Sequence, residues 1–180
     1  MVSAVLGESL KRTGHCFSQS TNKYYRRDGE VFFSIYHSGQ YCIFLYYLSS
    51  QIFLEYPEQR DLADKVYYLN RALNGLDLYY EVAMPEAFHL DHPLGSVMGR
   101  ATYGENFTFA QSCTVGNNKG VFPEIGRNVQ MLSGSKVLGR CCIGDNVLIA
   151  ANTYIKDADI PADSLVFGSS PNLVIKPRQR

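Results

Sequence analysis

The sequence contains no tryptophan, has no excess of charge of either sign and lacks a long uninterrupted hydrophobic run. Its 17 basic residues balance its 17 acidic residues, so it shows no electrostatic footprint for a nucleic acid. The most apolar stretch, residues 41–54, contains Ser49, Ser50 and Gln51 and is shorter than the ~18 apolar residues of a membrane span. We therefore expect neither a nucleic-acid partner nor a membrane-spanning segment.

Cysteine patterns typical of metal sites and disulfides are also missing. The five cysteines are odd in number, and none shows the C-x-x-C spacing of a zinc site or redox motif. Cys141 and Cys142 are adjacent, and such neighbours rarely form a disulfide. Residues 1–12 lack the apolar core of a signal peptide. We interpret all five cysteines as reduced thiols, and we expect a cytoplasmic protein without a metal site.

The composition changes near residue 80 of the 180-residue chain. Eleven of the 13 tyrosines precede position 81, whereas ten of the 15 glycines lie from Gly95 onward. With 46% hydrophobic residues, the chain has enough apolar material for one folded domain with a small N-terminal extension. We therefore expect two different ways of burying a core on the two sides of this change.

The first half has helical periodicity. Residues 61–73 predict a helix that ends at Asn74-Gly75, and Pro57 separates it from an earlier helix. The predicted buried face of the later helix consists of Leu62, Val66, Leu69 and Leu73. The earlier helix is apolar on all sides, so we expect it to be buried on several of them. Its main stripe consists of Tyr41, Leu45, Leu48 and Ile52. Before Tyr41 we expect mostly helix or loop.

The second half repeats with a period of six residues. A large apolar residue recurs at Ile125, Met131, Val137, Ile143, Ile149 and Ile155. A small or β-branched residue follows four positions later, at Val129, Ser135, Cys141, Val147 and Thr153. An earlier series with the same period consists of Val97, Tyr103, Phe109 and Val115. An excursion at residues 117–124 interrupts the repeat between the two series.

A period of six fits neither an α-helix, at 3.6 residues, nor a flat strand, at two. It is typical of short strands joined by turns and stacked on themselves as a solenoid. The aliphatic residue of each rung is then expected to point into the core, and glycines near asparagines are expected at the bends. The alternative is a coincidental run in a β-sandwich, which six unbroken repeats disfavour.

The repeats resemble those of the hexapeptide acyltransferases, and several segments resemble the serine acetyltransferases in the same order. The matching segments are residues 77–78, 90–92, 111–116, 136–139 and 168–171. The resemblance implies a mainly β fold, a left-handed parallel β-helix preceded by a small α-helical region. It divides the chain into a helical N-terminal region (residues 1–75), the β-helix (76–166) and a C-terminal tail (167–180). It also implies a homotrimer or a dimer of trimers.

The resemblance implies transfer of an acetyl group from acetyl-CoA to a small hydroxyl acceptor. It places the catalytic base on His92, its carboxylate partner on Asp77 and an acceptor-binding carboxylate on Asp91. A neutral imidazole can take the hydroxyl proton as the oxygen attacks the thioester. A carboxylate on the other ring nitrogen would fix the tautomer and stabilise the imidazolium. The structural alternatives are that Asp77 caps the first turn and that Asp91 only forms a turn.

The resemblance also implies an acetyl-CoA groove between neighbouring β-helices, where small residues let the pantetheine arm approach the backbone. The implied cofactor-binding residues are Gly116, Ser133, Gly134, Ser135, Lys136, Ala150 and Ala151. A backbone N–H near Gly116 would stabilise the oxyanion of the thioester, and Lys136 would meet the nucleotide phosphates. The alternative is that the turns themselves require small residues.

The sequence departs from the serine acetyltransferase pattern in the excursion. That family carries an Arg-His pair before a proline, which recognises the carboxylate of the substrate, whereas this chain has Val121-Phe122 before Pro123. An aliphatic and an aromatic side chain cannot pair with a carboxylate, and an unpaired charge in a closed site is costly. A sugar or amino sugar of surface-polysaccharide biosynthesis is therefore the alternative acceptor. Phe122 would then stack on the sugar or, alternatively, anchor the loop on a neighbouring subunit.

Two other classes of function compete with an acyltransferase. A non-catalytic β-helix scaffold would present a surface to a partner and would not bind acetyl-CoA. A zinc hydratase similar to the γ-class carbonic anhydrases would need three separated histidines, whereas the repeats hold only His89 and His92. We therefore expect an acetyl-CoA-dependent acyltransferase.

Overall fold

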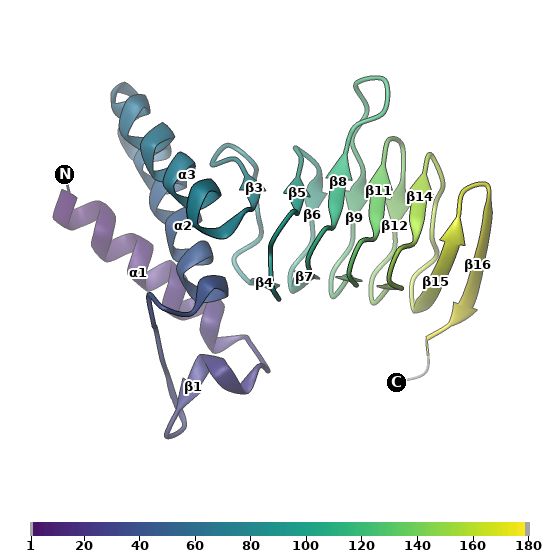
Figure 1. Ribbon diagram of the computed structural model, residues 1–180, viewed down its shortest axis with the longest axis horizontal. Coiled ribbons are helices and arrows are strands. Elements are labelled where there is room, and N and C mark those ends of the chain that lie inside the picture. The colour runs from purple at the N-terminus through teal and green to yellow at the C-terminus, as the bar shows by residue number, and fades with distance from the viewer. Residues whose placement is uncertain (1, 179–180) are drawn as a thin grey trace.

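The computed structural model describes residues 2–178. A helical region lies at one end of an elongated stack of short strands, and the stack ends in a two-stranded hairpin (Figure 1). The helices are α1 (Val2–Ser18), α2 (Ser38–Glu55) and α3 (Arg60–Asn74). Between them lie the 3-10 turns η1 (Lys23–Tyr25) and η2 (Pro57–Gln59) and a small hairpin of β1 (Arg26–Arg27) and β2 (Glu30–Val31).

The strands stack in parallel on three faces, which confirms the predicted β-solenoid with an N-terminal helical region. The first face contains β3 (Asp77–Leu78), β5 (Val97–Met98), β8 (Thr114–Gly116), β11 (Lys136–Leu138) and β14 (Tyr154–Lys156). The second face contains β4 (Phe88–Leu90), β7 (Phe107–Phe109), β10 (Gln130–Met131), β13 (Leu148–Ile149) and β15 (Ser164–Ser169). The third contains β6 (Thr102–Tyr103), β9 (Glu124–Ile125) and β12 (Cys142–Ile143).

The C-terminal segment extends this stack. β15 crosses the predicted boundary at residue 166 and pairs with both β13 and β14. β16 (Asn172–Pro177) then returns antiparallel to β15, so most of the segment expected as a tail is a β-hairpin. Residues 179–180 of that predicted tail lie outside the described residues.

The six-residue repeat fills the inside of the solenoid as predicted. All members of the regular series from Ile125 to Ile155 are at most 3% exposed. The small or β-branched residues of the second slot are also at most 3% exposed. Each residue stacks on its equivalent in the next turn, as Val137 does between Val115 and Ile155. The six-residue period therefore marks the side chains that form one continuous core.

The first rung corrects the predicted register. Val97 is 42% exposed, whereas its neighbour Met98 is 2% exposed and takes the inward place. Met98 pairs with Val115 in the next turn, and the following inward residue, Tyr103, pairs with Ile125. Because the inward residue is Met98 and not Val97, the corner before Tyr103 is one residue shorter than the six-residue period predicts. Gly99 permits the short corner, because a Cβ there would lie 2.7 Å from the Val115 carbonyl oxygen.

This register leads to a paired test of stability. We expect Met98→Ala to lower the free energy of unfolding by about 2–5 kcal/mol, because it leaves a cavity in the stacked core. Val97→Ala removes an outward side chain, and we expect less than ~1 kcal/mol. Urea unfolding followed by circular dichroism measures both. A larger loss for Val97→Ala than for Met98→Ala would contradict this register.

One corner of the solenoid is held by stacked asparagines. Asn106, Asn128 and Asn146 all adopt positive φ, a conformation that asparagine tolerates better than most residues. Asn106 Nδ2 donates to Asn128 Oδ1 at 3.1 Å, and Asn128 Nδ2 donates to Asn146 Oδ1 at 2.9 Å. Asn146 continues the ladder to Asp163. The predicted role of asparagine at the bends is confirmed.

The helical region closes the first rung of the solenoid. The α2 helix is buried on most sides, as its all-round apolar sequence predicted. Tyr46 Oη donates to the Val82 carbonyl at 2.6 Å, and Tyr47 Oη donates to the Glu86 carbonyl at 2.9 Å. Both rings pack edge-on against Phe88, which lies inside the first complete turn. One core therefore runs from the helices into the solenoid.

The predicted buried face of α3 is only partly correct. The helix ends at Asn74 as expected, and Gly75 adopts a left-handed φ of 63°. However, Leu69 and Leu73 are 42% and 58% exposed. The helix instead buries Asn70, whose Nδ2 donates to the Cys42 carbonyl of α2 at 3.0 Å. A satisfied polar side chain thus takes a place that hydrophobic periodicity assigned to leucine.

The sequence predicted reduced cysteines and no membrane-spanning segment. All five cysteines are free, as predicted, and four of them are buried. Among residues 2–178, no helix combines the length and apolar character needed to cross a bilayer.

Candidate functional site

His92 projects from the turn between β4 and β5. Leu90 points into the core, and the backbone N–H of Asp91 completes the pairing with the Phe109 carbonyl at 3.0 Å. The connection from Leu90 to Met98 is two residues longer than the equivalent one from Phe109 to Val115. His92 lies in this longer turn, exposed, with a φ of 51°. Such a backbone is disfavoured for most residues and clusters at functional sites.

An open groove of ≈ 850 Å³ lies beside His92. One wall is the corner of the solenoid, with Leu90, Asp91, His92, Ala110, Gln111 and Ser133. The other wall comes from the connection between α1 and α2 and the first residues of α2, with Asn22, Tyr24, Tyr36, His37, Ser38 and Gly39. The structure thus brings His92, Asp91 and Ser133 together among the predicted site residues.

Gln40 holds the wall contributed by the α1–α2 connection. It is fully buried at the start of α2, where its Oε1 accepts the Ser34 backbone N–H at 2.6 Å. Its Nε2 donates to the Tyr24 carbonyl at 3.0 Å. His37 caps α2, because its Nδ1 accepts the Gln40 backbone N–H at 3.2 Å. These bonds fix the irregular segment against the first residues of α2.

A smaller cavity of ≈ 230 Å³ continues from the groove and shares Asn22, Leu90, Asp91 and Ala110 with it. Its lining also includes Tyr25 and His89. Within residues 2–178, neither the Tyr25 hydroxyl nor either ring nitrogen of His89 has a hydrogen-bond partner, although these atoms are buried. Burial lowers the pKa of His89, so its ring is neutral near pH 7.

The Asp77 carboxylate interacts with side chains of α3 and not with the predicted base. Its Oδ1 accepts a hydrogen bond from Tyr67 Oη at 2.7 Å, and its Oδ2 lies 3.9 Å from an Arg71 guanidinium nitrogen. Burial and then this bond to Asp77 raise the pKa of Tyr67 to about 12, so the phenol remains a donor. No hydrogen bond or ion pair joins Asp77 to His92 within residues 2–178. The role of Asp77 as partner of the base stays a prediction.

Some predicted cofactor-binding residues follow His92 along one corner of the solenoid. The Gly134 backbone N–H donates to the Gln111 carbonyl at 2.9 Å, and the Asn152 N–H donates to the Ser133 carbonyl at 2.9 Å. These bonds align Ser133, Gly134 and the neighbouring pair Ala150 and Ala151 with the groove. Ala151 is exposed and Ala150 half-buried, so the corner offers small residues to solvent.

Three other predicted cofactor residues lie differently. Ser135 is fully buried, with its Oγ 3.6 Å from the Cys113 sulfur, so its side chain faces the core and not a groove. Lys136 is exposed, and its Nζ donates to the Gly134 carbonyl at 2.9 Å. Gly116 is the last residue of β8, where its carbonyl accepts the Gly139 N–H at 3.0 Å.

Phe122 does not line the groove. The excursion projects from the stack between β8 and β9 (Figure 1), and its tip pairs Asn118 with Val121. Phe122 is half-buried and packs on the core of its own chain. Its ring lies 3.3 Å from where a Cβ on Gly99 would be. Within one chain, the loop therefore anchors Phe122 away from His92.

The sequence reasoning missed the wall formed by the α1–α2 connection. Tyr24, Tyr36 and His37 lie in a segment without helical or six-residue periodicity, so no pattern assigned them a position. The available signal was compositional, because aromatic residues are frequent in this polar segment. Among residues 2–178, no cluster of three or more potential metal ligands occurs.

Comparison with protein families and curated proteins identifies relatives for much of the chain. Residues 122–157 match the family model "Bacterial transferase hexapeptide (six repeats)". Serine acetyltransferase from Helicobacter pylori (strain ATCC 700392 / 26695) is 32% identical over 116 residues, which cover 61% of this chain and 67% of that protein. The Staphylococcus epidermidis (strain ATCC 35984) enzyme is 29% identical over 144 residues, covering 77% and 66%.

Solved structures share the same fold. Serine acetyltransferase from Neisseria gonorrhoeae superposes with a TM-score of 0.79 at 22% identity, over 99% of this chain and 70% of that chain. A serine acetyltransferase in complex with CoA superposes with a TM-score of 0.70 at 18% identity, over 94% and 70%. At these identities the likeness establishes the fold, including the helical region and the solenoid together.

Proposed function

Because this chain belongs to the serine acetyltransferase family of hexapeptide-repeat transferases, we propose that it transfers an acetyl group from acetyl-CoA to a hydroxyl acceptor, with His92 as the general base. The single observation that carries the proposal is the position of His92. An exposed histidine in a left-handed turn borders a groove that is large enough for a small-molecule substrate. An acyltransferase is the enzyme class that the relatives indicate.

The reaction needs two proton transfers, one from the acceptor hydroxyl to His92 and one from His92 to the departing CoA thiolate. His92 takes the proton of the acceptor hydroxyl as its oxygen forms a bond to the thioester carbonyl carbon. The tetrahedral intermediate then collapses, the carbon–sulfur bond breaks, and the imidazolium returns the proton to the departing CoA thiolate. The thioester is already activated, so no covalent acyl-enzyme is required. Proton transfer by a positioned histidine typically contributes about 10²–10⁴-fold.

The acetyl-CoA arm is proposed to follow the corner that begins at His92. Ser133, Gly134 and Ala151 provide a path of small side chains along which the pantetheine arm approaches the backbone. Lys136 lies exposed beside this path. Assembly as trimers, which would place a second chain against this path, stays a prediction.

The proposal predicts acetyl-CoA-dependent turnover. Purified protein incubated with acetyl-CoA and a panel of hydroxyl acceptors is expected to release free CoA thiol in step with an acetylated product. Thiol release is followed with a chromogenic disulfide, and the product is identified by mass spectrometry. Titration calorimetry measures CoA binding separately. Protein that neither binds acetyl-CoA nor consumes it would overturn the proposal and favour the scaffold alternative.

A further inference from the structure

We propose that the acceptor bound beside His92 is a neutral, hydroxyl-rich molecule of the saccharide class, held by the α1–α2 connection. This inference rests on the proposed function, because it concerns the acceptor subsite of the same groove. It is carried by three independent features of the two joined cavities, namely the charge of the lining, the exposed tyrosines at the rim and the unpartnered polar atoms inside.

The described lining contains no permanent cation. Within residues 2–178, no lysine or arginine lines the groove or the smaller cavity, whereas Asp91 lines both. Two basic side chains that do not line the cavities contact lining residues. Lys23 lies over the Tyr24 ring at 5.1 Å, and Arg178 donates to Gln130 Oε1 at 3.2 Å. A substrate carboxylate in this groove would therefore lie near Asp91 without an opposing lysine or arginine, and like charges placed together are unfavourable.

Two exposed tyrosines stand at the rim of the groove. The side chain of Tyr36 is 94% exposed and that of Tyr24 is 63% exposed, although both lie on a segment that Gln40 holds in place. A large aromatic side chain exposed on a fixed segment leaves apolar surface in water without compensation within the chain. The apolar face of a pyranose ring covers such a surface while its hydroxyls stay hydrated.

The smaller cavity offers hydrogen-bonding capacity that residues 2–178 do not use. Within that range the Tyr25 hydroxyl and the two His89 ring nitrogens are buried without hydrogen-bond partners, which is unfavourable when nothing satisfies them. A neutral His89 has one donor and one acceptor nitrogen, and a hydroxyl can complement either. The Asp91 carboxylate accepts a long hydrogen bond from Asn22 Nδ2 at 3.5 Å, and its oxygens can accept further hydrogen bonds from the hydroxyls of a ligand.

These features combine in one molecule. An acceptor that presents one hydroxyl to His92 can direct other hydroxyls toward Asp91 and His89, while its apolar face lies on Tyr36. Free serine has one hydroxyl for the reactive position and an ammonium group that can pair with Asp91. However, its carboxylate meets no lysine or arginine in the described lining, and it has no apolar ring face to cover Tyr36. The chemistry of the lining therefore favours a saccharide over a free amino acid.

The test compares acceptors at equal concentration. Methyl glycosides of glucose, galactose, mannose and N-acetylglucosamine are assayed beside L-serine for acceptor-dependent CoA release. We expect kcat/KM for at least one glycoside to exceed that for serine by about tenfold or more. We expect Tyr36→Ala to raise the KM for that glycoside about tenfold while leaving the KM for acetyl-CoA unchanged. Tyr36→Phe keeps the ring and is expected to retain the original KM.

The matched control is Tyr68→Ala, which removes a 71% exposed tyrosine from α3, outside both cavities, and is expected to change neither KM. Preferred acetylation of serine, unaffected by Tyr36→Ala, would overturn the saccharide proposal and leave the acetyltransferase proposal intact. An enzyme that binds acetyl-CoA but acetylates none of the glycosides also overturns it. Absence of acetyl-CoA binding would instead overturn the proposed function itself.

Discussion

Replacing His92 with alanine is expected to lower kcat about 10²–10⁴-fold, because the groove then lacks the imidazole proposed to take the acceptor proton. The KM for acetyl-CoA is expected to stay nearly unchanged, since the imidazole acts on the acceptor and not on the thioester arm. His92 is exposed, so its removal leaves no cavity in the core. Steady-state kinetics with a saturating acceptor measures the effect.

Two further variants separate catalysis from backbone effects. His92 holds a φ of 51°, a conformation that asparagine tolerates, so His92→Asn keeps the turn while removing the base. His15→Ala is the matched histidine control, because His15 is exposed on α1 and does not line the groove. We expect His92→Asn to lose activity like His92→Ala and His15→Ala to keep it. Retention of most of kcat in both His92 variants would remove His92 from the role of general base.

The solenoid could be predicted because its signal is local and repeated. Each rung contributes the same two inward positions, and burial of Ile125, Met131 and Val137 follows from a period visible in the sequence. The exception is the first rung, where Met98 replaces Val97 because the corner at Gly99 is short. When a corner is one residue shorter, the strand beside it buries the opposite set of side chains. The six-residue period does not reveal such a change.

The candidate site was predictable only on its solenoid side. The resemblance of the Leu-Asp-His segment to the serine acetyltransferases identified the turn that bears His92, which borders the groove. The opposite wall depends on how an irregular segment packs, and Gln40 fixes it through two bonds to residues that no periodicity links. Long-range packing of this kind leaves no regular trace in the sequence.

The hydrogen-bond partner of Asp77 is a second feature that the sequence did not predict. The family resemblance implies that Asp77 lies near His92, and the Asp77 backbone N–H does donate to the carbonyl of Ser96, in the segment that follows the turn of His92, at 2.9 Å. The carboxylate nevertheless accepts its short hydrogen bond from Tyr67 of α3. The partner of this carboxylate depends on how α3 packs, and hydrophobic periodicity predicted the buried face of α3 only in part.

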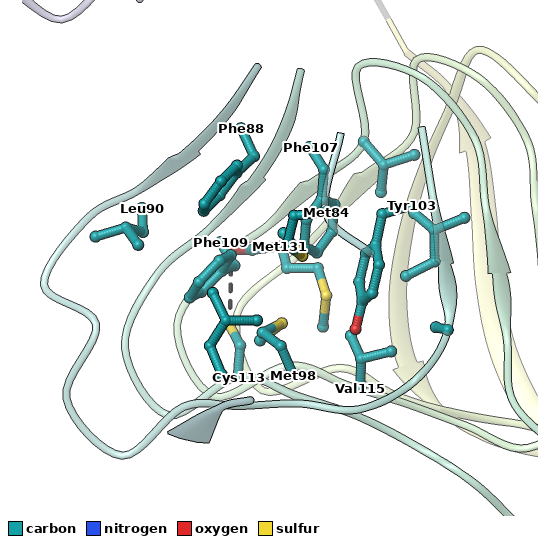
Figure 2. Packing of buried hydrophobic residues seen from close by; sticks show 14 of the residues in the cluster. Met84, Phe88, Leu90, Met98, Tyr103, Phe107, Phe109, Cys113, Val115 and Met131 are labelled. Carbon is teal, nitrogen blue, oxygen red and sulfur yellow. Dashed lines mark hydrogen bonds between the residues drawn. The ribbon is translucent and has the colours of Figure 1, made fainter. Parts of the chain in front are cut away.

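The core of the first turns contains a cluster of stacked aromatic rings. Phe107 and Phe109 lie on β7 with ring centroids 5.8 Å apart, and Tyr103 packs against Phe107 at 5.0 Å. Figure 2 shows Phe109 inside the solenoid beside Cys113 and Met131, both of which are buried. Turns of a solenoid contact mainly their neighbours, so the site corner depends on this layer directly beneath it.

We therefore expect Phe109→Ala to lower the free energy of unfolding by about 3–5 kcal/mol, the range for removing a fully buried phenylalanine. Urea unfolding followed by circular dichroism measures the change through the midpoint at constant m-value. Thr108→Ala is the matched control on the same strand, because Thr108 points outward, and it is expected to change stability by at most ~0.5 kcal/mol. A loss below ~1 kcal/mol for Phe109→Ala would mean that this layer relaxes around the missing ring, and the rigid support inferred for the His92 turn would then be wrong.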